Sequence, residues 1–267
     1  MSDRTRPIGI FDSGVGGLTV LKEIIRELPK EHTIYLGDTA RVPYGTRSPD
    51  TVIKYSFENT QFLMEKQVKL LVVACNTASS VSLALLTGKL PIPVVGVVEP
   101  GARAAVERSK VKKIAVIGTE TTINSSSYRR AIQSRETSAE VVEIACPLFV
   151  PLVEEGWITG EVVTLTARKY LAKVRDNGAD VLVLGCTHYP MIKDVISGIA
   201  RIPLVDSAVE TAREVHRILK EENMLHNNLE DSRREFFVTD SPEKFASTGD
   251  KFLGSAITNI SHVTVGG

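Results

Sequence analysis

Two cysteines stand in matching positions, each directly after a short apolar run. Cys75 lies in "VVACNTASS" at residues 72–80, and Cys186 lies in "VLGCTHYP" at residues 183–190. The pKa of a thiol falls beside a helix N-terminus or a cationic histidine, and the thiolate is the reactive form. The matching positions therefore indicate two reactive thiols. We assign the isolated Cys146 in "EIACPLF" to packing, which is the usual role of a lone buried cysteine.

Two thiols on opposite faces of one carbon can invert a stereocentre. A thiolate removes a proton from one face and a thiol returns a proton to the other, with no cofactor. Such a transfer needs direct contact with the carbon acid and a pKa near the working pH, and a thiol meets the second requirement. We expect this chemistry if Cys75 and Cys186 face each other across one cleft.

Continuous apolar runs predict the strands that would carry these thiols. Runs rich in Val and Ile, without polar alternation, are typical of parallel strands covered on both faces. They predict strands at Ile8–Phe11, Thr33–Gly37, Leu70–Ala74, Val94–Val97, Lys113–Ile117, Val141–Ala145, Val181–Gly185 and Leu204–Asp206.

Helix signals alternate with these strands. They predict helices at Leu18–Leu28, Pro49–Lys66 and Ser207–Leu225. In the tail, "RREFFVTD" and "ISHVTV" predict a further strand pair around a short helix that begins at Ser241. The alternation indicates an α/β fold.

Similar segments recur at long intervals. Cys186 follows Cys75 by 111 residues (186 − 75), and "IAVIGTETTI" follows "IGIFDSGVGG" by 106 (114 − 8). The spacing predicts two similar α/β domains, each with a mainly parallel sheet flanked by helices, and an active site in the cleft between them. With a boundary near Glu99–Pro100 and a return near Ser207, residues 1–98 plus 208–267 would form the first domain and residues 99–207 the second.

Polar residues follow several of the predicted strands. In open parallel sheets, ligands bind beyond the carboxyl ends of the strands, where helix N-termini supply N–H groups. We expect one cleft to collect the strand ends Asp12–Ser13, Asp38–Thr39, Cys75–Asn76–Thr77 and Cys186–Thr187–His188.

Four motifs in a fixed order carry a family resemblance. The segments "FDSGVGGLTV", "YLGDTARVPYG", "VVACNTAS" and "GCTHYP" resemble those of glutamate racemase, within the cofactor-independent aspartate/glutamate racemases, and the resemblance covers essentially the whole chain. It implies racemisation of L-glutamate to D-glutamate at Cα by two cysteine bases, with no cofactor and no metal. It further implies a cytoplasmic homodimer that supplies D-glutamate for bacterial peptidoglycan.

The resemblance also implies catalytic roles for individual residues. Cys75 would take the α-proton from D-glutamate, and Cys186 would take it from L-glutamate. Asp12 and His188 would each assist one thiol, with Glu155 as an auxiliary. Because a carboxylate raises the pKa of a neighbouring thiol and a cationic imidazole lowers it, the two thiols could be poised differently.

Substrate binding needs donors for two carboxylates and an acceptor for the α-ammonium group. Tyr44 and Gly45 match the family's segment for the side-chain carboxylate, and Asp12 is the expected acceptor for the ammonium group. The other predicted substrate-binding residues, compact donors and one imidazole, are Ser13, Asn76, Thr77, Thr187 and His188.

Other functions stay open at this stage. An aspartate racemase would share the motifs, and a Cys–His hydrolase could use Cys186 with His188, although it leaves Cys75 unexplained. A two-lobed small-molecule binding protein has the same architecture but no use for two opposed thiols. "DSGVGG" suggests dinucleotide binding, yet Thr19 stands where the third glycine is needed. Cys186 and His188 lack the additional ligand pair of a structural zinc site.

Composition argues against several classes of partner. Lys+Arg and Asp+Glu both number 32, so a formal net charge of zero leaves no basic excess for nucleic acid. No window holds the roughly 18 apolar residues of a transmembrane helix, and the N-terminus lacks a signal-type apolar run. We therefore expect a cytosolic protein that binds neither nucleic acid nor membrane, with 3 cysteines that form no structural disulfide set.

Overall fold

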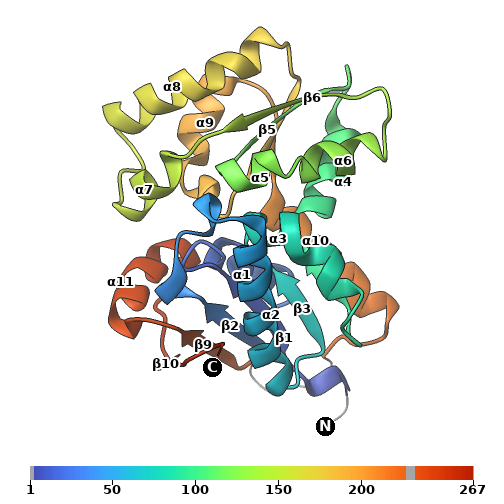
Figure 1. The fold of residues 1–267 in the computed structure, drawn as a ribbon, viewed down its shortest axis with the longest axis vertical. Helices are drawn as coiled ribbons and strands as arrows, with labels where there is room; N and C mark the ends of the chain where they lie inside the picture. The colour runs from blue at the N-terminus through green and yellow to red at the C-terminus, as the bar shows by residue number, and fades with distance from the viewer. Residues whose placement is uncertain (1–2, 227–231, 267) are drawn as a thin grey trace.

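The protein folds into two lobes, each built around a parallel sheet. The structure is a computed structural model that describes residues 3–226 and 232–266. Figure 1 shows the lobes stacked along the long axis of the molecule. The first sheet has the strand order β10-β9-β2-β1-β3-β4 and the second the order β6-β5-β7-β8. Every strand pairing in both sheets is parallel, which confirms the predicted fold class.

The strands of the first sheet come from both ends of the chain, and those of the second come from its middle. The first sheet contains β1 (Ile8–Asp12), β2 (Thr33–Gly37), β3 (Leu70–Val73), β4 (Val94–Gly96), β9 (Arg234–Val238) and β10 (Ile260–His262). The second contains β5 (Lys113–Gly118), β6 (Glu140–Ala145), β7 (Val181–Gly185) and β8 (Leu204–Asp206). Each predicted strand is therefore present, and the two tail segments pair as predicted.

Helices cover the faces of both sheets. The α-helices are α1 (Leu18–Glu27), α2 (Pro49–Glu65), α3 (Asn76–Thr87), α4 (Val98–Arg108), α5 (Glu120–Asn124), α6 (Ser127–Gln133), α7 (Phe149–Glu154), α8 (Glu161–Asp176), α9 (Lys193–Ala200), α10 (Ser207–Glu221) and α11 (Pro242–Leu253). Short 3₁₀ helices are η1 (Asp3–Thr5), η2 (Thr39–Arg41), η3 (Tyr44–Thr46) and η4 (Tyr189–Ile192).

Local side chains explain where several helices begin and end. The Ser48 side chain accepts a hydrogen bond from Thr51 N at the start of α2, and Asp206 caps α10 in the same way. The predicted helix from Ser207 to Leu225 is too long. It ends at Glu221, because Asn223 has a φ of 56°, a left-handed conformation that an α-helix cannot continue through.

The lobes share part of their hydrophobic core. One cluster of buried side chains includes Ile10 and Val72 of the first sheet together with Ile117 and Leu182 of the second. Helix α10 packs against both α1 and α4. Two further clusters cover the other faces of the sheets, so both sheets are buried on two sides, as continuous apolar strands require.

The sheet topology supports a division of the chain into two domains. Strands up to β4 and from β9 onward pair in one sheet, and β5 to β8 pair in the other. On this basis we propose residues 1–98 plus 208–267 as the first domain and residues 99–207 as the second. Among the described residues, no helix combines the length and the apolar character needed to cross a bilayer.

Candidate active site

A cavity of about 310 Å³ lies where the two lobes meet, and both cysteine segments line it. We call it the interlobe cavity. Most of the predicted site residues lie on its wall: Ser13, Tyr44, Gly45, Cys75, Asn76, Thr77, Cys186, Thr187 and His188. Residues far apart in the sequence are thus brought to one site, as expected from the carboxyl ends of parallel strands.

Cys75 follows β3 and occupies the capping position of α3. Its sulfur lies 3.8 Å from Oγ of Ser13, and the residue is buried. Burial, followed by the nearby Asp12 carboxylate, raises the pKa of the Cys75 thiol to about 12. In the free protein Cys75 is therefore a thiol at neutral pH, ready to donate a proton.

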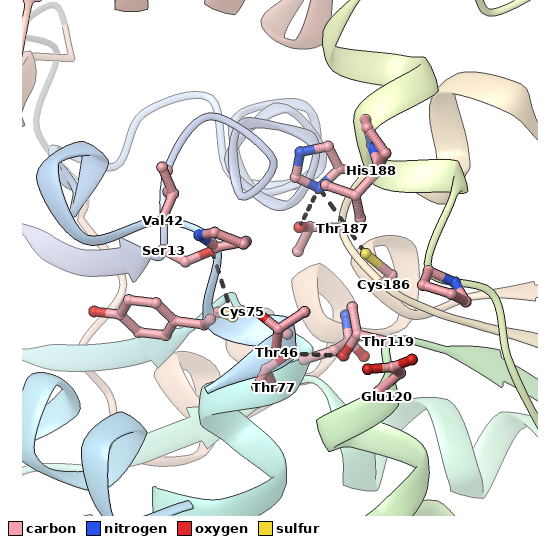
Figure 2. Close-up of a pocket in the computed structure, with 18 of the residues that line it drawn as sticks. Ser13, Val42, Thr46, Cys75, Thr77, Thr119, Glu120, Cys186, Thr187 and His188 are labelled. Carbon is pink, nitrogen blue, oxygen red and sulfur yellow. Dashed lines mark hydrogen bonds between the residues drawn. The ribbon is translucent and has the colours of Figure 1, made fainter. Parts of the chain in front are cut away.

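Cys186 follows β7 and lies beside an imidazole. Its sulfur is 3.9 Å from Nδ1 of His188, and the other ring nitrogen, Nε2, is 3.0 Å from Oε1 of Glu154. Burial by itself lowers the pKa of His188, but its hydrogen bonds to Cys186 and Glu154 outweigh that effect and raise the pKa to about 10. The ring is thus a cation at neutral pH. Figure 2 shows Cys75 and Cys186 on opposite sides of the cavity.

The structure places Glu154, rather than the predicted Glu155, against His188. Glu155 is exposed and lines a smaller neighbouring cavity with Val42 and Lys244. Consecutive residues of a helix point about 100° apart, and both glutamates lie at the end of the short helix α7. In this structure Glu154, and not the predicted auxiliary Glu155, contacts His188, where α7 packs against η4.

Asp12 is completely buried and is not among the residues that line the interlobe cavity. Its Oδ2 accepts a hydrogen bond from Gly14 N at 2.9 Å, while Oδ1 has no hydrogen-bond partner among the described residues. Burial raises the pKa of Asp12, although His188 opposes the shift. The geometry brings Asp12 close to Cys75 but does not place it as a direct acceptor for the α-ammonium group.

Asn76, one of the residues that line the cavity, has an unpaired amide donor. Its Oδ1 accepts a hydrogen bond of 2.7 Å from the buried Tyr128 hydroxyl, which fixes the orientation of the amide. Its Nδ2 is buried and has no partner among residues 3–226 and 232–266. An unpaired buried donor costs free energy, so this site favours an acceptor such as a carboxylate oxygen.

Comparisons with known proteins agree with this geometry. A model of the family described as Asp/Glu/hydantoin racemase matches residues 8–215. The chain belongs to this racemase family. Glutamate racemase from Geobacter metallireducens is 55% identical over 262 residues, which is 97% of this chain and 97% of that protein.

Solved structures of other racemases have the same fold. The glutamate racemase of Francisella tularensis subsp. tularensis, in complex with D-glutamate, has a TM-score of 0.93 and 37% identity, with 98% of each chain covered. The RacE1 isoform of glutamate racemase from Bacillus anthracis has a TM-score of 0.95 and 41% identity, again over 98% of each chain. Racemases are isomerases, so this member of the racemase family is an enzyme of that class.

The glycine-rich segment of this racemase allows the two lobes to approach each other closely. A Cβ atom on Gly16 would lie 2.4 Å from Oγ1 of Thr187 and 2.5 Å from Cε1 of His188. Thr19 Oγ1 also donates to the carbonyl of Thr187 at 2.9 Å. The segment "DSGVGG" therefore packs the first lobe directly against the residues that follow Cys186.

Threonines that were not predicted complete the site of the racemase. Thr119 follows β5, lines the cavity, and its Oγ1 lies 3.0 Å from Oγ1 of Thr77 in the other lobe. Thr122 lies 3.3 Å from the same Thr77 oxygen and 2.9 Å from that of Thr119. The segment "IAVIGTETTI" was the available signal, because it matches "IGIFDSGVGG" as a strand that ends in small polar residues.

In the part of the chain that the structure describes, His, Cys, Asp and Glu side chains form no group of three or more that could hold a metal ion.

Proposed function

We propose that this chain is a glutamate racemase that interconverts L- and D-glutamate through two cysteines, without a cofactor. The observation that supports this most is the pair of thiols, one from each lobe, on opposite sides of one cavity. A Cys–His hydrolase would need only Cys186 and His188, and it would leave the matched Cys75 without a role.

The first step moves the α-proton of L-glutamate to the sulfur of Cys186. The cationic His188 lies beside this sulfur and stabilises negative charge on it before the transfer. Cys75, whose pKa is raised to about 12, then gives its thiol proton to the opposite face of the carbon. In the D-to-L direction Cys75 must lose its proton first, and the nearby base is Asp12, whose pKa is raised by burial. Cys186 then takes a proton from the neighbouring His188, and its thiol gives that proton to the opposite face of the carbon.

The substrate lies between donors from both lobes. The unpaired Nδ2 of Asn76 and the hydroxyl groups of Ser13 and Thr187 bind the α-carboxylate, where negative charge develops as the proton leaves. Tyr44 and Gly45 bind the side-chain carboxylate, in the position that the family resemblance implies.

We infer a cytoplasmic role in supplying D-glutamate for peptidoglycan, in line with the glutamate racemases that this chain resembles. We also propose that the chain forms a homodimer. Four apolar side chains near α7 and α8 are each at least half exposed, which is typical of a protein interface: Leu148, Trp157, Val162 and Leu165. Sedimentation velocity of the purified protein tests the dimer, and a monomer at all concentrations would reject it.

Isotope exchange tests the proposed reaction. The purified protein is incubated with L-glutamate in D₂O, without added cofactor, while optical rotation and α-deuterium uptake are followed by NMR. We expect loss of optical rotation together with α-deuteration. Loss of rotation without deuterium uptake would reject proton transfer, and reaction with L-aspartate alone would assign the chain to aspartate instead.

A further inference from the structure

A buried carboxylate outside the interlobe cavity holds one wall of that cavity. Residues 42–46, which we call the wall segment, all line the cavity, and they lie between η2 and the start of α2. No sheet hydrogen bonds hold this segment, because the sheet ends at Gly37 of β2. Its position therefore depends on side-chain contacts.

Asp38, the residue that directly follows β2, supplies these contacts. Its side chain is fully buried, and it is not among the residues that line the cavity. The carboxylate accepts hydrogen bonds from the Tyr44 hydroxyl and, at 2.9 and 2.8 Å, from Nε of Arg41. Thr239 Oγ1 donates to it at 3.0 Å. One carboxylate thus binds Arg41, which directly precedes the wall segment, and Tyr44 within it.

The Tyr44 hydroxyl can act only as a donor to this carboxylate. Burial, followed by the charge of Asp38, raises the pKa of Tyr44 far above its ordinary value. Asn59 Nδ2 donates to the same hydroxyl oxygen at 3.1 Å, so both of the tyrosine's hydrogen-bonding functions are satisfied. Since the ring belongs to the wall segment, this bond fixes the wall relative to β2.

The second lobe holds the wall segment from the other side. Thr121 Oγ1 donates to the carbonyl oxygens of Gly45 and Arg47, at 2.9 and 3.1 Å. A Cβ atom on Gly45 would lie 2.8 Å from Cβ of Thr119, so the backbone there is already in close contact. The wall segment is fixed between Asp38 and Thr121, and it closes one side of the cavity.

We propose that Asp38 is a positioning residue that sets how long a substrate side chain the cavity accepts, by holding the wall segment in place through Tyr44. The inference rests on the proposed function, in which an amino acid with a side-chain carboxylate occupies the cavity. Asp38 contacts neither the thiols nor the cavity, so its removal changes binding of the distal carboxylate more than proton transfer. One methylene group more or less in a substrate changes its kcat/KM relative to a competing substrate by roughly 10- to 200-fold.

The test compares Asp38→Asn and Tyr44→Phe with the wild type, using L-glutamate and L-aspartate. We expect KM for L-glutamate to rise and its preference over L-aspartate to fall about tenfold, with kcat changed by less than about twofold. In Asp38→Asn, Arg41 keeps its ion pair with Glu58, so no buried charge is left alone. Tyr44→Phe removes a single hydroxyl group and keeps the test valid if the first variant does not fold.

A matched control is Asp180→Asn. This carboxylate also accepts hydrogen bonds, from Ser109 Oγ at 2.6 Å and Val111 N at 2.9 Å, but it lies at a turn outside the cavity. We expect its KM and substrate preference to equal those of the wild type. Unchanged KM and preference in Tyr44→Phe, or a loss confined to kcat, would overturn the positioning role. An inactive wild type would instead reject the proposed function itself.

Discussion

Nε2 of His188 lies 3.0 Å from Oε1 of Glu154, and the opposite side of the same ring faces the sulfur of Cys186. The imidazole is buried, whereas the glutamate side chain is 45% exposed. Glu154 is therefore a carboxylate at the rim that, together with Cys186, favours the charged form of a ring inside the site. The adjacent Glu155 makes no such contact and provides a natural comparison.

Glu154→Gln should lower the pKa of His188 from about 10 toward its ordinary value near 6.5, because a neutral amide no longer stabilises the imidazolium. NMR titration of the ring measures this directly. We expect slower turnover of L-glutamate, since Cys186 loses its cationic neighbour. Glu155→Gln is the control and should leave both the titration and the rate unchanged. Equal shifts in the two variants would contradict the assignment.

The same contact makes stability depend on pH. The pKa of His188 is higher in the folded chain than in the unfolded one, so folding favours the protonated ring. This stabilisation is fully present below about pH 6.5 and is lost as the pH rises through about 10. Urea unfolding across this window should show the wild type losing stability relative to Glu154→Gln. A difference independent of pH would argue against a protonated ring.

Removing one thiol should separate proton exchange from racemisation. In Cys75→Ala, Cys186 can still take the α-proton of L-glutamate and return a deuteron to the same face. We expect α-deuteration of L-glutamate without formation of D-glutamate, and racemisation reduced by about 10²- to 10⁴-fold. Cys186→Ala should show the converse with D-glutamate. NMR and chiral chromatography of the recovered amino acid measure both quantities.

Cys146→Ala is the control for these variants. Cys146 is buried, its Sγ lies 3.6 Å from the carbonyl oxygen of Ile144, and it does not line the interlobe cavity. We expect racemisation close to that of the wild type. Substantial racemisation by Cys75→Ala would rule out the route through two thiols.

Gly16→Ala should impair catalysis by separating the lobes. The added methyl group would overlap Thr187 and His188, so the second lobe must move away from the first. Displacing catalytic groups by about 1 Å can cost roughly 10²-fold in rate, and we expect kcat/KM to fall by that order. The control is Gly198→Ala in α9, where a Cβ meets nothing within 4 Å. It should keep full activity and gain up to about 1 kcal/mol of stability.

Lys69 and Glu31 should matter for folding but not for chemistry. Their side chains are 1% and 2% exposed, and Nζ lies 2.6 Å from Oε2. Lys69→Met leaves Glu31 as an unpaired buried charge, so we expect the free energy of unfolding to fall by about 3–5 kcal/mol. Urea unfolding measures the loss, and the rate per folded molecule should not change. Lys113→Met breaks an ion pair with Glu140 in which the two side chains are 41% and 73% exposed. We expect this variant to lower the free energy of unfolding by at most about 1 kcal/mol.

The sequence by itself determined the strands, the fold class and the two thiols. Buried parallel strands such as β1 and β7 are apolar on both faces, so their pattern is local and readable. Cys75 and Cys186 were recognisable because each directly follows such a strand. The carboxyl ends of parallel strands lie at the same edge of a sheet. Residues that directly follow a predicted strand could therefore be assigned to the site from the sequence.

Tertiary structure alone decided which neighbouring side chains complete the site. Glu154 rather than Glu155 reaches His188 because of how α7 packs. Asp12 is buried and does not line the interlobe cavity. The wall segment is set by Asp38 and Thr121, which come from different lobes. The Thr121 contact depends on the docking of one lobe on the other, whereas the contacts of Glu154 and Asp38 depend on packing within one lobe. Local periodicity encodes neither.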